Sequence, residues 1–273
     1  MSNKVLGGVL SEQQLHQFHE EGYLIVRGLF AQEVEQIKEE FMRLHALGTI
    51  PGCFHAVPAE EAGGDILKQY PRMMHPHKIN DTAFEYMLHP KVMHILADLF
   101  GGDPLAAQSM FYFKPPGAKG QALHQDQFYL KVEPGTCIAA WTAVDPADEE
   151  NGGLMVVPRS NKLAVECPHQ ADPQVSFTKE EVEVPEGYEV VPAVMEAGDV
   201  LFFNGSVIHG SYPNRSADRF RRAFICHYSD VDTTRIGKYY KPLYRYDGTD
   251  VTLEDNEDAG PCGTEFEAVS AAH

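Results

Sequence analysis

The stretch Gln121-Ala-Leu-His-Gln-Asp-Gln-Phe-Tyr-Leu130 places a histidine and an aspartate two positions apart, at His124 and Asp126. Side chains at i and i+2 of an extended strand point to the same face. A strand over 123–127 would therefore direct an imidazole and a carboxylate toward one metal ion. An isolated H-x-D is common by chance, so the prediction depends on the segments that follow it.

A second segment, residues 196–211, supplies the third ligand that such a site needs. It consists of a Gly-Asp turn, a short apolar run and then His209. His124, Asp126 and His209 would form a 2-His-1-carboxylate triad. This triad leaves positions open on the metal and is typical of non-haem Fe(II) oxygenases.

A basic turn, residues 214–222, follows His209 and leads into an apolar segment that begins at Ala223. Arginine binds a carboxylate through two parallel hydrogen bonds, so this turn fits a site for a dicarboxylate co-substrate. If Arg221 begins the strand, period two places Arg221 inside and Arg222 outside. Arg219 and Arg222 remain alternatives at this point.

The order of elements predicts the fold. Helical patterns cover about 12–21, 31–47, 81–88 and 90–100, whereas residues 51–69 are irregular and polar. Short strands are expected at 109–113, 123–127, 137–144, 154–157, 189–194, 200–203, 207–209 and 223–228. Helices followed by about eight strands indicate a mainly β, cupin-like jelly roll with N-terminal supporting helices. We expect one domain over residues 1–273, with a core of about 9–230 and a mobile or loosely packed acidic tail over 249–273.

Composition excludes several classes of partner. A formal net charge of −18 over 273 residues argues against nucleic-acid binding and against anionic membrane surfaces. No apolar run approaches the length of a membrane span, and the N-terminus has no signal-peptide core. The five cysteines have no C-x-x-C spacing, so we expect reduced thiols in a cytoplasmic protein.

Seven segments resemble the phytanoyl-CoA dioxygenase family of Fe(II)/2-oxoglutarate oxygenases in sequence and order. They are Phe18-His-Glu-Glu-Gly-Tyr-Leu-Ile-Val26, Lys114-Pro-Pro116, Leu123-His-Gln-Asp126, Ala140-Trp-Thr-Ala143, Asn151-Gly-Gly-Leu154, Val157-Pro-Arg-Ser160 and His209-Gly-Ser211. The resemblance covers about residues 9–230. It implies a double-stranded β-helix, the cofactors Fe(II), 2-oxoglutarate and O2, and hydroxylation of an unactivated C–H bond with release of succinate and CO2.

The resemblance also assigns site residues. Matching the family's basic pair followed by alanine selects Arg221 for the distal carboxylate of 2-oxoglutarate, although the turn before it is one residue longer than expected. The other positions that match the co-substrate pocket are Gln125, Trp141, Met110, Lys78 and Ser211. Each has an ordinary explanation too: a single tryptophan is most often a core residue, and an isolated lysine usually lies on the surface.

Other histidines are weaker candidates for metal ligands. His75 and His77 form H-x-H, but Pro76 between them disfavours a central strand. His227 is better explained as a core histidine or as one that supports the site from behind the ligands.

The substrate is not specified by these motifs. The excess of acidic residues, 40 against 22 basic ones, favours a small metabolite over an acyl-CoA, whose phosphates need a basic cluster. Its pocket would include Tyr112, Gln127, Tyr129 and His75. The alternatives are an acyl-CoA 2-hydroxylase, a jelly-roll metal enzyme without co-substrate and a non-catalytic metal- or 2-oxoglutarate-binding module. A halogenase is disfavoured because Asp126 occupies the position where halogenases have a small residue.

Overall fold

A computed structural model describes residues 6–258 and 260–265. Its helices are α1 (Glu12–Glu21), α2 (Val34–Ala46), α3 (Ala59–Ala62), α4 (Ile66–Gln69), α5 (Asp81–Met87), α6 (Pro90–Phe100) and α7 (Asp126–Leu130), with 3-10 turns at Pro76–Lys78, Ser160–Lys162, Lys238–Tyr240 and Gly260–Glu265. Helix α1 has the bounds predicted from the sequence, 12–21, because residues at both ends fix where it starts and stops. Ser11 and Gln14 form a capping box, and Gly22 ends the helix with a φ of 83°.

Two antiparallel sheets form the body of the molecule. The larger has the order β1-β10-β5-β12-β3-β14-β15, with β2 also paired to β3, and the smaller has the order β4-β11-β6-β9. The strands of the larger sheet are β1 (Tyr23–Val26), β2 (Met73–Met74), β3 (Pro104–Tyr112), β5 (Ile138–Ala143), β10 (Val200–Asn204), β12 (Ala223–Asp230), β14 (Leu243–Tyr244) and β15 (Asp250–Val251). Those of the smaller sheet are β4 (Gln121–His124), β6 (Leu154–Val156), β9 (Val191–Ala193) and β11 (His209–Ser211). Two further pairs are β7 (His169–Gln170) with β8 (Glu180–Glu181) and β13 (Arg235–Ile236) with β16 (Glu254–Asp255).

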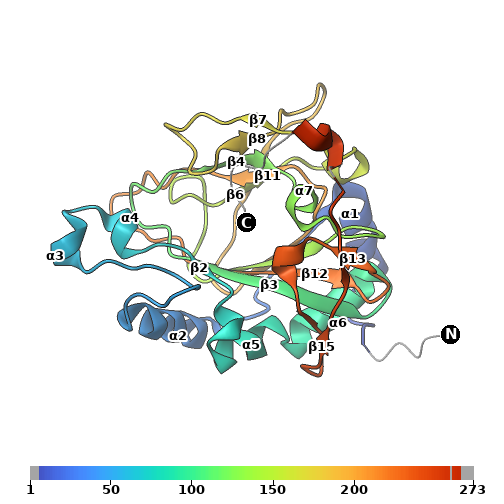
Figure 1. The fold of residues 1–273 in the computed structure, drawn as a ribbon, viewed down its shortest axis with the longest axis horizontal. Coiled ribbons are helices and arrows are strands. Elements are labelled where there is room, and N and C mark those ends of the chain that lie inside the picture. The colour runs from blue at the N-terminus through green and yellow to red at the C-terminus, as the bar shows by residue number, and fades with distance from the viewer. Residues whose placement is uncertain (1–5, 259, 266–273) are drawn as a thin grey trace.

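Helices cover one face of the larger sheet, and the smaller sheet covers the other (Figure 1). Helices α2, α5 and α6 lie against one face, where Phe41 stacks on Phe111 of β3 with ring centroids 4.0 Å apart. The other face looks toward the smaller sheet, and there Trp141 and Ile225 pack against Val156 in a second apolar cluster. The predicted double-stranded β-helix with N-terminal supporting helices is confirmed.

Several boundaries differ from the sequence prediction. The strand expected over 109–113 already begins at Pro104. The strand expected over 123–127 ends at His124, and Asp126 begins the short helix α7. The strand expected over 207–209 begins only at His209, and the segment 51–69, expected to be irregular, contains α3 and α4. Apart from β3, these elements are three to five residues long, too short for a periodic pattern to indicate them.

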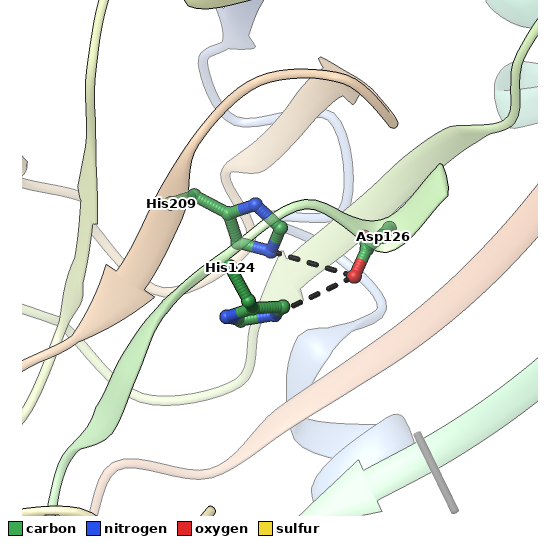
Figure 2. Close-up of side chains that lie close together, drawn as sticks. All are labelled: His124, Asp126 and His209. Carbon is green, nitrogen blue, oxygen red and sulfur yellow. Dashed lines mark ion pairs between the residues drawn. The ribbon is translucent and has the colours of Figure 1, made fainter. Parts of the chain in front are cut away.

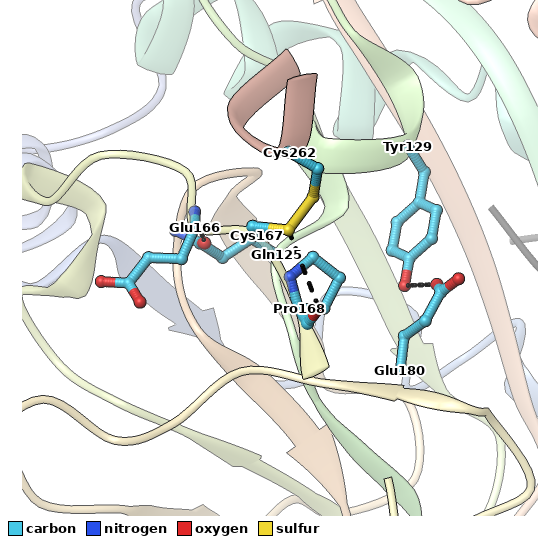
Figure 3. Close-up of a disulfide and its surroundings, with 7 residues drawn as sticks. All are labelled: Gln125, Tyr129, Glu166, Cys167, Pro168, Glu180 and Cys262. Carbon is cyan, nitrogen blue, oxygen red and sulfur yellow. Dashed lines mark hydrogen bonds between the residues drawn. A yellow bond between two sulfur atoms is a disulfide. The ribbon is translucent and has the colours of Figure 1, made fainter. Parts of the chain in front are cut away.

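The C-terminal segment is packed where it is described, which corrects the expectation of a mobile or loosely packed tail. Strand β16 pairs with β13, and Asn256 donates a hydrogen bond to the carbonyl of Lys131, just after α7. Cys262 forms a disulfide with Cys167 across 95 residues (Figure 3). The expectation that every cysteine is reduced was therefore wrong for this pair, because a pairing so distant in sequence has no local spacing signal. Residues 266–273 of the predicted tail lie outside the described residues.

Within residues 6–258 and 260–265, no helix has the length and apolar character that crossing a bilayer requires. The remaining three cysteines, Cys53, Cys137 and Cys226, are free and buried.

Candidate metal centre

The two histidines of the predicted triad face each other across neighbouring strands. His209 of β11 is the register partner of His124 of β4, and directly opposed residues of antiparallel strands hold their side chains close together. Their ring centroids are 4.2 Å apart. The sheet pairing, rather than the H-x-D spacing, brings the second histidine to the site.

Hydrogen bonds give both imidazoles the protonation pattern of metal ligands. His124 Nδ1 lies 2.8 Å from the carbonyl of Ala122, and His209 Nδ1 lies 2.9 Å from the carbonyl of Val207. A carbonyl only accepts, so each Nδ1 donates, and each Nε2 of a neutral ring keeps its lone pair. These Nε2 atoms are the ones that face the metal site, although the side-chain amide of Gln121 lies 3.1 Å from Nε2 of His124 and would have to move aside for a metal ion.

Asp126 completes the cluster from the first turn of α7 (Figure 2). Its Oδ1 lies 3.5 Å from Nε2 of His124 and 3.6 Å from Nε2 of His209. Ligand atoms of the three buried residues all lie within 4.8 Å of one another, and among the described residues they form the one group arranged in this way. The predicted triad is therefore brought together, although Asp126 reaches it from a helix and not from a strand.

The charges in this cluster favour a bound cation. Burial opposes ionisation of Asp126, but His209, His227 and His124 outweigh it, and the pKa of this carboxyl lies well below its usual range. Burial, together with the neighbouring His124, lowers the pKa of His209 to about 4. At neutral pH the site thus offers a carboxylate and a neutral His209, and nitrogen and carboxylate donors suit iron.

Arg221 and Lys114 lie together at a second position on the inner side of the sheets. Arg221 follows the basic turn just before β12, is 3% exposed and donates from Nε to the carbonyl of Gly152 at 2.9 Å. Its Nη1 is buried without a hydrogen-bond partner among the described residues. Burial lowers the pKa of Arg221 to about 10, which keeps it charged at neutral pH.

Lys114 is the neighbouring cation and donates to Ser211 Oγ at 2.8 Å. Burial, with a smaller contribution from Arg221, lowers the pKa of Lys114 well below its usual value. In the described part of the chain, neither Lys114 nor Arg221 has a carboxylate at ion-pair distance. Two buried cations without a counter-ion are costly, so this pair fits a bound anion.

The two alternative arginines, Arg219 and Arg222, form ion pairs with nearby carboxylates. Arg219 pairs with Asp148 and Glu150, and Arg222 makes a two-pronged ion pair with Asp145. Of the three arginines considered from sequence, the structure places Arg221 inside. This agrees with the period-two argument for β12.

Trp141 and Met110 accompany Arg221. The guanidinium of Arg221 lies 5.2 Å from the Trp141 ring and 6.0 Å from the Tyr112 ring. Met110 packs in the same apolar cluster as Trp141. With Ser211, which comes two residues after the ligand His209, these side chains form the surroundings expected for a co-substrate.

Two residues matched to the co-substrate pocket lie elsewhere. The amide of Gln125 donates to the carbonyl of Ser206 at 2.8 Å and accepts from the backbone of Glu166 at 2.8 Å, so it is occupied in joining loops (Figure 3). Lys78 is exposed at the end of the 3-10 turn Pro76–Lys78. The structure does not group either residue with Arg221.

Of the four predicted substrate residues, two lie near the site and two do not. Tyr112 borders the co-substrate surroundings, and Tyr129 lies with its ring 6.3 Å from that of His124 while donating to Glu180 at 2.6 Å. Gln127 instead donates to the carbonyl of Val132 at 2.8 Å. His75 stacks edge-on to His77, 5.7 Å away, and neither histidine belongs to the metal-ligand cluster.

One residue with a place in the site had not been assigned to it from the sequence. Lys114 was named only within the segment Lys114-Pro-Pro116, because its contact with Ser211 spans 97 residues. His227 was predicted to be a core histidine or one that supports the site from behind the ligands, and the structure places it against Asp126, 101 residues away in sequence.

A cavity of about 270 Å³ adjoins Lys114 and Tyr112. Its lining combines aromatic rings with cations and contains no acidic side chain: Leu67, Tyr70, Arg72, Tyr112, Phe113, Lys114, Pro115, Ala118, Lys119 and Phe177.

Comparisons with known proteins agree with this geometry. The family model described as phytanoyl-CoA dioxygenase matches residues 18–223. A probable phytanoyl-CoA dioxygenase of Caenorhabditis elegans is 29% identical over 254 residues, covering 84% of this chain and 78% of the relative. The peroxisomal phytanoyl-CoA dioxygenase of Mus musculus is 30% identical over 240 residues, covering 82% and 70%.

The fold also matches a solved structure of the epimerase SnoN from nogalamycin biosynthesis, in complex with Fe3+, α-ketoglutarate and nogalamycin RO. The TM-score is 0.64 at 20% identity, covering 82% of this chain and 84% of that one. At this identity the likeness concerns the fold. The sequence match to the family model and to the curated relatives is what decides membership, and this chain belongs to the phytanoyl-CoA dioxygenase family.

Proposed function

We propose that this chain is an Fe(II)- and 2-oxoglutarate-dependent oxygenase that hydroxylates an unactivated C–H bond of a small molecule, with release of succinate and CO2. His124, Asp126 and His209 would hold the iron, which supplies the activation of O2. The observation that carries the proposal is the pair of buried cations without a carboxylate, Arg221 and Lys114, inside the same jelly roll as the metal-ligand cluster.

The protein's own residues bind and orient in this proposal. Arg221 Nη1 and Lys114 Nζ would donate to the distal carboxylate of 2-oxoglutarate, as charge-assisted hydrogen bonds to anions are the strong ones. Trp141 and Met110 would exclude water from the middle of the co-substrate. The keto acid end would then be left for the metal held by His124, Asp126 and His209.

The substrate proposed is a small metabolite with an apolar body and an anionic group. The cavity beside Lys114 has a size suited to a compact ligand, and its lining is mainly apolar. Arg72 lies 5.9 Å from the Phe177 ring and donates to Tyr112 Oη at 3.3 Å, so a cation borders an aromatic wall. A carboxylate or phosphate group of the substrate would bind at Arg72.

An acyl-CoA substrate is the second candidate, because the curated relatives at 29% and 30% identity are named phytanoyl-CoA dioxygenases. A CoA thioester carries several phosphates and would extend well beyond a cavity of about 270 Å³. The net charge of −18 also opposes its approach.

The test is a screen for substrate-stimulated release of succinate and CO2 from 2-oxoglutarate. The panel pairs small aromatic or apolar acids with acyl-CoA thioesters, including phytanoyl-CoA. Stimulation by a small acid and none by the thioesters is expected. Efficient hydroxylation of an acyl-CoA at micromolar KM would refute the choice of substrate class, and a loaded enzyme that never consumes 2-oxoglutarate would refute the reaction.

A further inference from the structure

His227 is a buried histidine that lies beside the metal centre without belonging to it. It is in β12, where Phe224 and Cys226 face the helices and Ile225 packs toward the smaller sheet. His227 is 2% exposed, and its Nε2 lies 3.0 Å from Asp126 Oδ2. The larger sheet therefore contributes a side chain that contacts one of the predicted metal ligands.

The two oxygens of Asp126 have different surroundings. Oδ1 faces Nε2 of His124 at 3.5 Å and Nε2 of His209 at 3.6 Å, so it is the oxygen placed to bind a metal with these nitrogens. Oδ2 faces His227 instead. The carboxylate is thus divided between a metal-facing oxygen and an oxygen held by the protein.

In His227 the ring nitrogen that donates a hydrogen bond is the opposite one from that in the two metal-ligand histidines. A carboxylate accepts, so His227 Nε2 donates to Asp126 Oδ2. Its Nδ1 is buried and has no hydrogen-bond partner among the described residues, as expected for the bare nitrogen of a neutral ring. In His124 and His209, by contrast, Nδ1 donates to a backbone carbonyl, and Nε2 is the nitrogen left to accept. His227 is therefore arranged to hold the carboxylate and not the metal.

We infer that His227 is a positioning residue that keeps Asp126 a one-oxygen ligand. A carboxylate can bind a metal through one oxygen or through both. If Oδ2 were released, it could bind the metal as well and fill a position that a chelating co-substrate or O2 requires. Holding Oδ2 keeps those positions open. This inference rests on the proposed function, since it concerns the same metal.

If the role of His227 were purely structural, its loss would lower the stability of the fold and leave the coordination of any bound metal unchanged. Ser229 is the matched control, because it lies in the same strand, is fully buried and has an Oγ without a partner among the described residues. Replacing it disturbs β12 without touching Asp126.

The experiment loads Mn(II) anaerobically into the full-length wild type, His227→Leu, His227→Gln and Ser229→Ala. Water-proton relaxation then reports the exchangeable waters on the metal, and titration reports the Kd of 2-oxoglutarate. Wild type should hold about three waters, and His227→Leu should lose about one of them while its Kd for 2-oxoglutarate rises about tenfold or more. His227→Gln, which retains a donor near Oδ2, should resemble wild type, as should Ser229→Ala.

Several outcomes decide the matter. Wild-type water number and Kd in His227→Leu would overturn the inference, and so would an equal change in Ser229→Ala. If His227→Leu fails to fold, His227→Asn, whose amide is too short to reach Oδ2, replaces it. Equal values for His227→Asn and His227→Gln would then overturn the inference, and fewer waters in His227→Asn alone would support it. A wild type that binds neither Mn(II) nor Fe(II) would refute the proposed function itself.

Discussion

The two groups of buried polar residues inside the jelly roll are opposite in chemistry. Around His209 the side chains offer lone pairs and one carboxylate, whereas around Arg221 they offer only donors and positive charge. Strand β11 links them, because His209 begins it and Ser211, the partner of Lys114, ends it. The first group, the lone-pair end of the site, and the second group, its cation end, together suit a molecule that chelates a metal and carries a distant carboxylate. Each end makes a separate prediction.

The largest effect is expected at the lone-pair end. Replacing Asp126 or His209 by alanine removes one of three metal ligands, and we expect turnover to be abolished and Fe(II) affinity to fall by at least a hundredfold. Anaerobic metal titration measures this effect. His77→Ala is the control, since His77 is a buried histidine outside the ligand cluster. Full iron occupancy in both ligand variants would show that the metal is bound elsewhere.

At the cation end, Arg221→Ala should weaken the binding of 2-oxoglutarate and leave the binding of the metal unchanged. Losing one partner of a buried charge pair costs about 2–5 kcal/mol, which raises the KM for 2-oxoglutarate well over tenfold. Iron affinity should change little. Arg219→Ala, which removes a surface arginine paired with Asp148, should leave that KM unchanged. The reverse pattern would mean that the register of the basic turn is wrong by two residues.

Substitution of Lys114 tests whether one or two side chains bind the anion at the cation end. Lys114→Ala removes one charge-assisted hydrogen bond, so the KM for 2-oxoglutarate should rise about tenfold, less than in Arg221→Ala. Lys162→Ala is the control, because Lys162 pairs with Glu20 on the surface. An unchanged KM in Lys114→Ala would leave Arg221 as the sole anion-binding side chain.

His77 lies in neither group and shows what burial does to a histidine without a metal. Burial, followed by the neighbours His75 and Lys78, lowers the pKa of His77 from 6.5 to about 3. Folding therefore favours the neutral form of His77. The free energy of unfolding is highest above pH 6.5, where the histidine is neutral in both states, and it decreases as the pH falls below 6.5. Between pH 6.5 and pH 5 the loss is about 2 kcal/mol. His209 and the other buried histidines remain in His77→Gln, so denaturant unfolding at both pH values should show a loss about 2 kcal/mol larger in wild type than in this variant. Equal losses would contradict the burial argument.

The sequence predicted the metal ligands and Arg221 better than the residues around them. His124, Asp126 and His209 could be recognised because H-x-D is followed by a later histidine and a basic turn, and Arg221 because a strand alternates its faces. The helical start of α7 was missed, since the H-x-D spacing favoured a strand through residue 127. His227 was expected to be a core histidine or one that supports the site, but its contact with Asp126 was not predicted. Neither were the role of Lys114 and the Cys167–Cys262 disulfide, because each partner lies 95 or more residues away.

The most direct test of a site with two such ends compares 2-oxoglutarate with 2-oxobutyrate, which has the same chelating group and lacks the distal carboxylate. Binding of each to the Fe(II)-loaded protein is measured anaerobically, in wild type and in Arg221→Ala. Wild type should prefer 2-oxoglutarate by well over tenfold, and Arg221→Ala should lose most of that preference while retaining iron. Equal binding of both acids by wild type, or an undiminished preference in Arg221→Ala, would contradict the assignment of Arg221 to the co-substrate.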